Sequence, residues 1–246
     1  IEAKQPVEQL LGTGRGVRVG VVDSGWDRSI FDPRVSKGVG LVDLENDLAL
    51  CFSDDDNDRI GHGTACASLI MRSAPDAEIV PIRVFGRRLE TSVPILVAGL
   101  NWAVERALQV VNLSLGTLRW QALRPLYAAC ERARHAGVII VAARDTARMW
   151  SFPAVFDNVI GVEAGQVKRP YGLRYKMDAA IECVANGRHR VRWRGGGLRV
   201  LQGNSLAAPI ISGAVARLLE VQPLANLATI RTLLNTNAST FGQRRL

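Results

Sequence analysis

The chain carries the stretch Gly203-Asn204-Ser205-Leu206-Ala207-Ala208-Pro209, which continues as Ile210-Ile211-Ser212-Gly213-Ala214-Val215-Ala216-Arg217-Leu218-Leu219. A glycine turn here precedes small and apolar residues with helical spacing, so we expect a helix to start close to Ser205. A helix N-terminus offers unpaired amide groups and a positive dipole end, and both stabilise developing negative charge. Ser205 is therefore a candidate nucleophile. The alternative is a serine that only caps the helix.

Two upstream stretches offer partners for this hydroxyl. Asp23 follows the β-branched run from Val17 to Val22, which predicts a buried strand. Open α/β sheets place their chemistry at the carboxyl ends of such strands. His62 lies in Gly61-His62-Gly63-Thr64, where a second helix is predicted to begin. The simpler interpretations are that Asp23 caps a turn and that His62 is structural.

Asp23, His62 and Ser205 together match one kind of chemistry. A serine hydroxyl is a weak nucleophile, so it needs an imidazole to remove its proton. The imidazole in turn needs a carboxylate that holds its tautomer and stabilises its charged form. The three residues therefore form a candidate catalytic triad.

The rest of the chain alternates between predicted strands and helices. We expect strands over Gly38 to Val42, Glu78 to Val84, Val110 to Leu115, Val138 to Ala142 and Val159 to Ala164, and helices over Val93 to Leu108 and Gln121 to Ala136. This alternation predicts an α/β fold, a three-layer α/β/α arrangement with a mainly parallel central sheet. The region from Lys168 to Gln202 is strand-like and rich in turns. We find no repeat or linker and expect a single domain over residues 1–246.

Composition limits the partners. The chain has 246 residues, is 48% hydrophobic and carries a formal net charge of +8. The arginines are scattered, apart from a dense stretch from Arg188 to Arg199 that we interpret as a basic hairpin. There is no aromatic and basic module of the RNA-binding kind, so no nucleic acid is expected as a partner. No apolar run approaches the length of a membrane span, so no membrane is expected either.

The cysteines and an acidic run bear on cofactors. Cys51, Cys66, Cys130 and Cys183 form no Cys-x-x-Cys motif, so zinc is not expected. Unpaired thiols favour a cytoplasmic protein, although a secreted mature form remains an alternative. The run from Asp54 to Asp58 predicts a solvated loop, a structural calcium site or a rim that attracts basic substrate residues. We expect no metal in the catalytic site.

Three short motifs resemble those of the subtilisin-like serine proteases, peptidase family S8. Asp23-Ser24-Gly25 is similar to the aspartate box of that family, Gly61-His62-Gly63-Thr64 to its histidine box, and Gly203 to Pro209 to its serine box. The resemblance covers about residues 17–220. It implies a serine endopeptidase that forms an acyl-enzyme on peptide or protein substrates. Ser205 would be the nucleophile, His62 the general base and then acid, and Asp23 the orienting carboxylate.

The resemblance also implies a substrate cleft. Val111 to Gly116 is similar to the family's substrate-binding strand, in which the last residues form one wall of the pocket for the side chain before the scissile bond. The segment from Leu89 to Thr91 would pair with the substrate backbone by β-augmentation. The implied substrate-binding residues are Leu89, Glu90, Thr91, Ser114, Leu115, Gly116, Ala143 and Arg144.

The sequence departs from the family at Ala142-Ala143-Arg144-Asp145, where the family has Ala-Gly-Asn and the asparagine donates to the oxyanion. Loss of such a donor costs about 10²–10³ in kcat. Three interpretations remain open. Asp145 donates as a neutral acid, or it turns away toward Arg144 or Arg148, or the domain is a peptide-binding pseudoprotease. We also expect Arg144 to narrow the specificity pocket and to disfavour large aromatic or basic residues before the cut.

The resulting prediction is a narrow-specificity processing protease, with a pro-segment or partner chain as a further candidate partner. We expect that the chain lacks the long inhibitory pro-segment of secreted family members. The alternative functions are a catalytically impaired pseudoprotease that binds peptides, and a peptide ligase or macrocyclase in peptide maturation. The ligase would use the same three residues.

Overall fold

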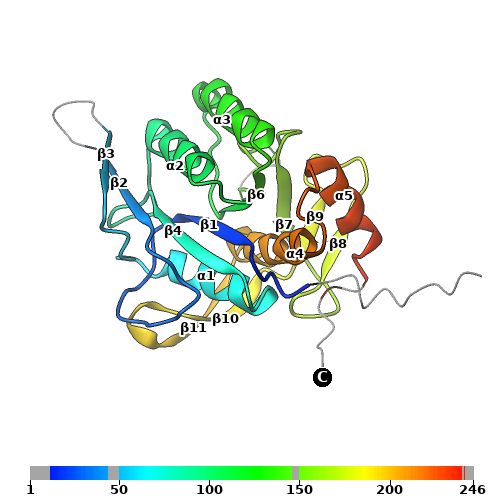
Figure 1. The fold of residues 1–246 in the computed structure, drawn as a ribbon, viewed down its shortest axis with the longest axis horizontal. Helices are drawn as coiled ribbons and strands as arrows, with labels where there is room; N and C mark the ends of the chain where they lie inside the picture. Colours follow the sequence, from blue (N-terminus) through cyan, green and yellow to red (C-terminus); the bar gives the residue numbers. More distant parts are fainter. Residues whose placement is uncertain (1–11, 44–49, 146–149, 240, 242–246) are drawn as a thin grey trace, which may run out of the picture.

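The computed structural model describes residues 12–43, 50–145, 150–239 and 241 (Figure 1). Nine strands of this part form one sheet in the order β3-β2-β4-β1-β5-β6-β7-β9-β8. Only β3 on β2 and β8 on β9 pair antiparallel. The strands are β1 (Arg18–Asp23), β2 (Val39–Asp43), β3 (Leu50–Ser53), β4 (Glu78–Arg83), β5 (Val110–Leu113), β6 (Ile139–Ala143), β7 (Ile160–Ala164), β8 (Leu173–Tyr175) and β9 (Cys183–Ala185).

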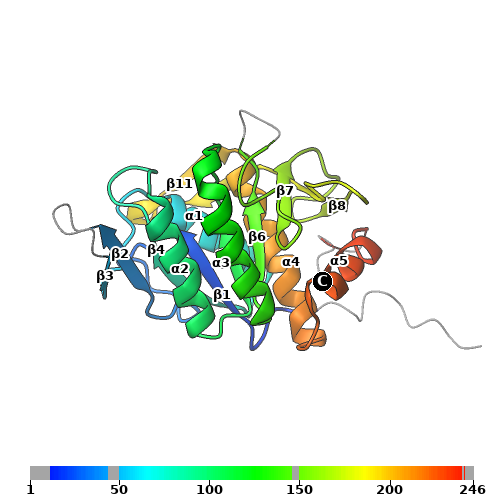
Figure 2. The ribbon, with the colours of Figure 1, turned by 90° about the horizontal axis from the view of Figure 1, so that it is seen from above.

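Helices cover both faces of the sheet. One layer consists of α1 (His62–Ser73), α4 (Ala208–Val221) and α5 (Leu227–Thr236), and the other of α2 (Val93–Glu105) and α3 (Leu123–His135). Figure 1 shows α2 and α3 above the sheet and α1 and α4 below it, and Figure 2 shows the same layers from above. The predicted three-layer, mainly parallel fold is confirmed.

The central strands are apolar on both sides because each side faces a helical layer. Val19 and Val21 of β1 pack into the core beneath α1 and α4, whereas Val22 packs into the core beneath α2 and α3. Small residues let α1 and α4 approach closely. A Cβ on Gly213 would lie 2.5 Å from the Ser73 Cβ, so the glycine is required for this contact. The N-termini of α1 and α4 both follow loops at the carboxyl edge of the sheet.

The structure refines several predicted boundaries. The helix predicted over Val93 to Leu108 ends at Glu105, and a 3₁₀ turn over Trp120–Ala122 precedes α3. The basic hairpin is confirmed as an antiparallel ribbon of β10 (Arg188–Arg192) and β11 (Leu198–Gln202). The short strand β3 was not predicted. Within the described ranges, no helix combines the length and apolar character needed to cross a bilayer.

Candidate active site

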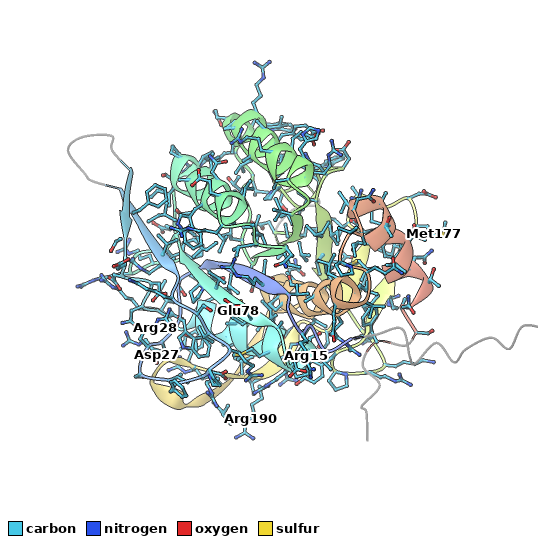
Figure 3. The ribbon with its side chains drawn as sticks, in the orientation of Figure 1. Arg15, Asp27, Arg28, Glu78, Met177 and Arg190 are labelled. Atoms are coloured by element: carbon cyan, nitrogen blue, oxygen red, sulfur yellow. The ribbon has the colours of Figure 1, made fainter. Side chains whose placement is uncertain are left out.

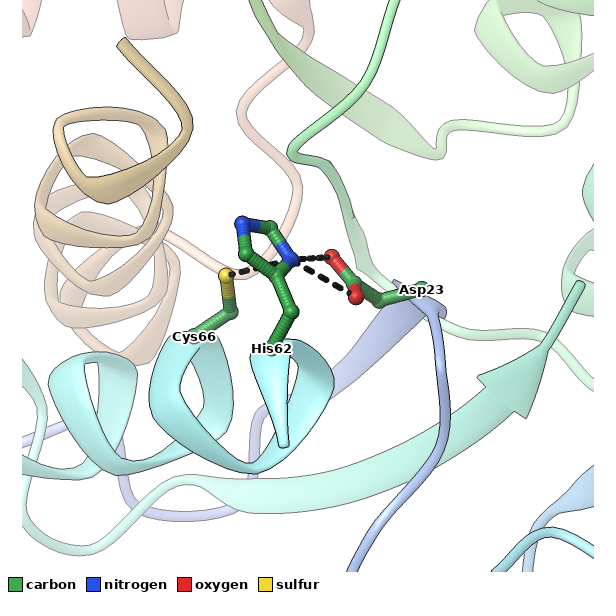
Figure 4. A group of neighbouring side chains, drawn as sticks. All are labelled: Asp23, His62 and Cys66. Carbon is green, nitrogen blue, oxygen red and sulfur yellow. Dashed lines mark hydrogen bonds and ion pairs between the residues drawn. The ribbon is translucent and has the colours of Figure 1, made fainter. Parts of the chain in front are cut away.

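Asp23 and His62 meet where β1 ends and α1 begins. Asp23 is the last residue of β1 and fully buried, and His62 is the first residue of α1. The His62 Nδ1 atom lies 2.8 Å from Oδ1 and 2.9 Å from Oδ2 of Asp23 (Figure 4). In the neutral imidazole, Nδ1 therefore carries the hydrogen and donates a hydrogen bond to the carboxylate, which leaves Nε2 as an acceptor. In Figure 4 this second nitrogen points away from Asp23.

Glycines bring the two residues together. Gly61, just before His62, has φ +109°, a left-handed conformation that glycine adopts without strain. A Cβ on Gly63 would lie 2.3 Å from the carbonyl oxygen of Gly25, so the first turn of α1 contacts the loop after β1 directly. The Gly63 amide also donates to Ser24 Oγ at 2.8 Å. The backbone therefore fixes the position of His62 relative to Asp23.

Burial and charge act on the imidazole in opposite directions. Burial is the largest single influence and lowers the pKa of His62, but the charge and hydrogen bonding of Asp23, together with the contribution of Cys66, outweigh it. The pKa of His62 therefore lies well above its ordinary value of 6.5. Cys66, one turn further along α1, places its Sγ 3.8 Å from Nδ1. Burial raises the pKa of this thiol, which therefore remains neutral.

Ser205 lies in a 3₁₀ turn (Asn204–Leu206) that precedes α4. The N-cap position of α4 belongs to Ala207, which has no hydroxyl, so the interpretation of Ser205 as the helix cap is wrong. Ser205 and His62 line the same open cavity of about 1000 Å³. The structure thus places all three candidate catalytic residues together at the carboxyl edge of the sheet, although they are up to 182 positions apart in the sequence (205 − 23).

A chain of buried hydrogen bonds holds the Ser205 backbone. Ser114 Oγ donates to the Ser205 carbonyl at 2.8 Å, and Asn112 Nδ2 donates to Ser114 Oγ at 2.9 Å. Asn112 Oδ1 in turn accepts from Ser212 Oγ of α4 at 3.0 Å. Ser114 was predicted in the substrate wall, whereas the roles of Asn112 and Ser212 were not predicted. A buried asparagine in the apolar strand β5 was the available signal, because buried amides need partners.

Arg144 and Asp145 follow β6 and line a smaller cavity of about 270 Å³ with Ser205 and Ala143. Asn204 clamps this segment, because its amide donates to the Arg144 carbonyl at 2.9 Å and accepts from the Ala164 amide at 2.7 Å. The Arg144 guanidinium pairs with Glu163 at 3.4 Å. The Asp145 amide donates to Ser151 Oγ at 2.8 Å. The expected partner Arg148 lies outside the described residues.

Six of the implied substrate-binding residues line the larger cavity, whereas Ala143 and Arg144 line the smaller one. The lining of the larger cavity includes Leu89, Glu90, Thr91, Ser114, Leu115 and Gly116. Residues 84–92 form an irregular loop without sheet pairing, and Leu89 is half exposed. Pairing of this loop with a substrate strand stays a prediction.

Part of the acidic run from Asp54 to Asp58 is buried and hydrogen-bonded within the fold. Asp56 and Asp58 are buried, so the prediction of a solvated loop is wrong for these two. Asp56 holds Arg28 and the Gly38 amide, and Asp58 accepts from the amide groups of residues 60, 61 and 64. Asp54 pairs with Lys37 at 2.9 Å. These three carboxylates therefore already form hydrogen bonds or ion pairs with groups of the protein.

The described cysteines and the other potential metal ligands bear on whether this protein holds a metal ion. Cys66, Cys130 and Cys183 are free and buried, whereas the side chain of Cys51 lies outside the described set. Among the described residues, one group of potential metal ligands gathers within 4.8 Å, namely Asp23, His62 and Cys66. Since Asp23 already binds the imidazole, this group is better suited to orienting His62 than to holding a metal.

Comparisons with known proteins show which chains this one is similar to. A sequence model of the Subtilase family matches residues 14–246. Subtilisin DY from Bacillus licheniformis is 26% identical, over 93% of this chain and 86% of that protein. Subtilisin Savinase from Lederbergia lenta is 30% identical, over 95% and 87%. The crystal structure of a cold adapted subtilisin-like serine proteinase shares the fold with a TM-score of 0.76, at 23% identity over 92% of this chain and 83% of that one.

Proposed function

Since the chain belongs to the subtilase family and is a subtilisin-like serine endopeptidase, we propose that Ser205, His62 and Asp23 carry out its peptide-bond hydrolysis. The observation that carries this assignment is the bidentate approach of Asp23 to His62 Nδ1 beside the cavity that Ser205 lines. This arrangement leaves the basic nitrogen of the imidazole available to the hydroxyl.

The proposed reaction proceeds in two acyl-transfer steps. The Ser205 hydroxyl attacks the substrate carbonyl and passes its proton to His62 Nε2. His62 then gives this proton to the leaving amine, and an acyl-enzyme forms on Ser205. Water, deprotonated by His62, releases the acyl group in the second step. Throughout, the Asp23 carboxylate holds His62 Nδ1 and stabilises the imidazolium.

The oxyanion site is the next part of the proposal. We propose that the Ser205 backbone amide is its main donor and that Asp145 contributes only when its carboxyl group is neutral. An ionised carboxylate beside a developing oxyanion would raise the barrier by direct repulsion. The hydrogen bond from Ser114 to the Ser205 carbonyl supports this proposal, because it holds the adjoining backbone in place.

Asp145→Asn tests this assignment directly. The neutral amide can donate without titrating, so kcat should rise about 10-fold to 10³-fold at neutral pH with little change in KM. Asp157→Asn, at a carboxylate that bonds to the Tyr127 hydroxyl, serves as the control. An unchanged or lower kcat for Asp145→Asn would overturn the proposed oxyanion site.

We further propose narrow specificity for small, uncharged residues before the scissile bond. The cavity of about 270 Å³ beside Ser205 is at the small end for a ligand pocket, and Arg144 lines it. The Glu163 pair holds the guanidinium against this wall, with Lys176 on the other carboxylate oxygen at 2.8 Å. A small pocket with a cation in its wall should exclude both bulk and positive charge.

A peptide library cleaved by the wild type and by Arg144→Gly tests this specificity. The wild type should prefer alanine over phenylalanine before the cut, and the variant should gain about 10-fold or more for phenylalanine. Arg124→Gln, on the exposed face of α3, should leave the profile unchanged. Equal acceptance of phenylalanine and lysine by the wild type would refute narrow specificity. Binding of peptides without any cleavage would favour the pseudoprotease alternative.

A further inference from the structure

The arginine-rich ribbon of β10 and β11 is not used by the proposed triad. Segment 188–202 contains five arginines and no acidic residue. Within the described part of the chain, no carboxylate forms an ion pair with any of them. Asp32, which lies near Arg192, is already held by Arg34 through two hydrogen bonds. Asp27 likewise lies near Arg194 and is held by the Gly195 amide and by Ser29. Among the described residues, Arg188 and Arg190 therefore carry positive charge that no carboxylate pairs with.

One face of the ribbon presents this charge in a regular row. Directly opposite residues share a face, and the register pairs Arg188 with Gln202, Arg190 with Val200 and Arg192 with Leu198. Their neighbours His189 and Val191 are buried, so the arginines point outward. Successive arginines of the row are about 6.7 Å apart, which is also the spacing of alternate residues in an extended peptide.

The same face carries exposed aliphatic side chains. Leu198 is 51% exposed and Val200 is 59% exposed. This face therefore offers a bound peptide apolar contacts as well as ion pairs. Figure 3 shows Arg190 at the outer edge of the molecule, pointing away from the sheet.

The ribbon is joined to the active site at both ends. At its open end, Gln202 lines the small cavity together with Ser205, and Arg188 lies directly opposite Gln202. At its tip, the Trp193 ring covers Gly61, next to His62, and the Gly195 amide donates to Asp27 at 2.6 Å. Figure 3 shows Asp27 beside this tip. The ribbon is therefore a fixed part of the rim around the candidate nucleophile.

Its position also defines which part of a substrate it would meet. The loop 84–92 and the segment 114–116 line the larger cavity on the side of α2 and α3. The ribbon instead packs on α1, in the opposite layer. A substrate would place the side chain before the scissile bond in the small cavity and its earlier residues in the larger one. The residues after the scissile bond would then leave Ser205 toward the ribbon.

We propose that the ribbon binds acidic side chains of the substrate on the C-terminal side of the scissile bond, with Arg188 and Arg190 as the main contacts. This inference rests on the proposed function of Ser205. The partner is an extended peptide segment in which Asp or Glu alternate with other residues. Arg190, Arg188 and Gln202 lie in one row that leads to the nucleophile, so the second to fourth residues after the cut are the ones within reach.

The test compares two peptides that are identical up to the scissile bond and carry either glutamate or glutamine at the second and fourth positions after it. For the wild type, kcat/KM should be about threefold or more higher for the glutamate peptide, and this ratio should shrink with added salt. In Arg188→Gln/Arg190→Gln the ratio should fall to about one. Arg124→Gln/Arg174→Gln removes the same charge on other faces and should keep the wild-type ratio.

A binding measurement separates this inference from the proposed function. Fluorescence anisotropy with Ser205→Ala should show tighter binding of the glutamate peptide, and Arg188→Gln/Arg190→Gln should abolish the difference. If neither peptide is hydrolysed, the proposed function fails, yet the anisotropy result still decides the role of the ribbon. Equal affinity of Ser205→Ala for both peptides would overturn the proposal that the ribbon binds acidic side chains. Tighter binding of a single-stranded oligonucleotide through the same arginines would instead assign the ribbon to nucleic acid.

Discussion

Asp23→Asn should show how much the Asp23 carboxylate contributes to kcat by orienting and charging His62, while the other site residues stay unchanged. Both carboxylate oxygens lie within 2.9 Å of His62 Nδ1, in a position with no exposure to solvent. At about 4 Å between charge centres and an effective dielectric constant of about 20, the interaction with the imidazolium is about 4 kcal/mol. This energy corresponds to about 10³ in rate. The amide also favours the wrong imidazole tautomer, so the expected loss in kcat is about 10⁴.

Steady-state kinetics from pH 5 to 10 provides the assay, because the same substitution should move the pH profile. Asp23 raises the pKa of His62, so the residual activity of the variant should persist to lower pH than that of the wild type. KM should change little, since Asp23 is buried beneath the cleft. Asp32→Asn, which loses a carboxylate that pairs with Arg34, is the control and should keep nearly full activity. A loss below tenfold with an unmoved profile would refute the assigned role of Asp23.

Further predictions concern titration and packing. Neutral His62 is the reactive form, so the acid limb of kcat/KM in the wild type should lie above pH 6.5, and a midpoint at or below that value would contradict the raised pKa. The same pKa shift should stabilise the fold fully below about pH 6.5, the unfolded value, and less as the pH rises through the folded value, as urea unfolding at several pH values can show. Gly63→Ala forces a Cβ against the Gly25 backbone and should lower the unfolding free energy by about 1–3 kcal/mol in thermal melts; an unchanged midpoint would mean that the loop moves freely. Arg231→Met leaves Glu182 buried without its partner at 2.9 Å and should cost about 3 kcal/mol, whereas the double substitution with Glu182→Gln should recover part of that loss.

Local patterns were enough to predict the layers and the position of each candidate catalytic residue. The run from Val17 to Val22 is apolar on both sides because it becomes a central strand, and the small residues after Ser205 become the buried α4. Asp23 and His62 were found because turns and glycines flank them at element ends. Such patterns depend only on neighbours in the sequence.

Features that depend on tertiary contacts were not predictable in this way. The roles of Asn112 and Ser212 appear only when β5 and α4 are brought side by side. Burial of Asp58 requires the start of α1 to fold over the acidic run, so its composition indicated a solvated loop instead. The capping interpretation of Ser205 was wrong because Ser205 lies within a 3₁₀ turn that precedes α4. Such short turns have no clear sequence periodicity.

Covalent labelling with a fluorophosphonate probe tests the central claim most directly. The probe reacts only with an activated serine, so mass spectrometry of the wild type should show a single adduct on Ser205, with none on Ser205→Ala. The labelling rate should rise with pH as His62 loses its proton. Absence of any adduct on Ser205 in protein that circular dichroism shows to be folded would contradict the account of Asp23, His62 and Ser205 as a working triad.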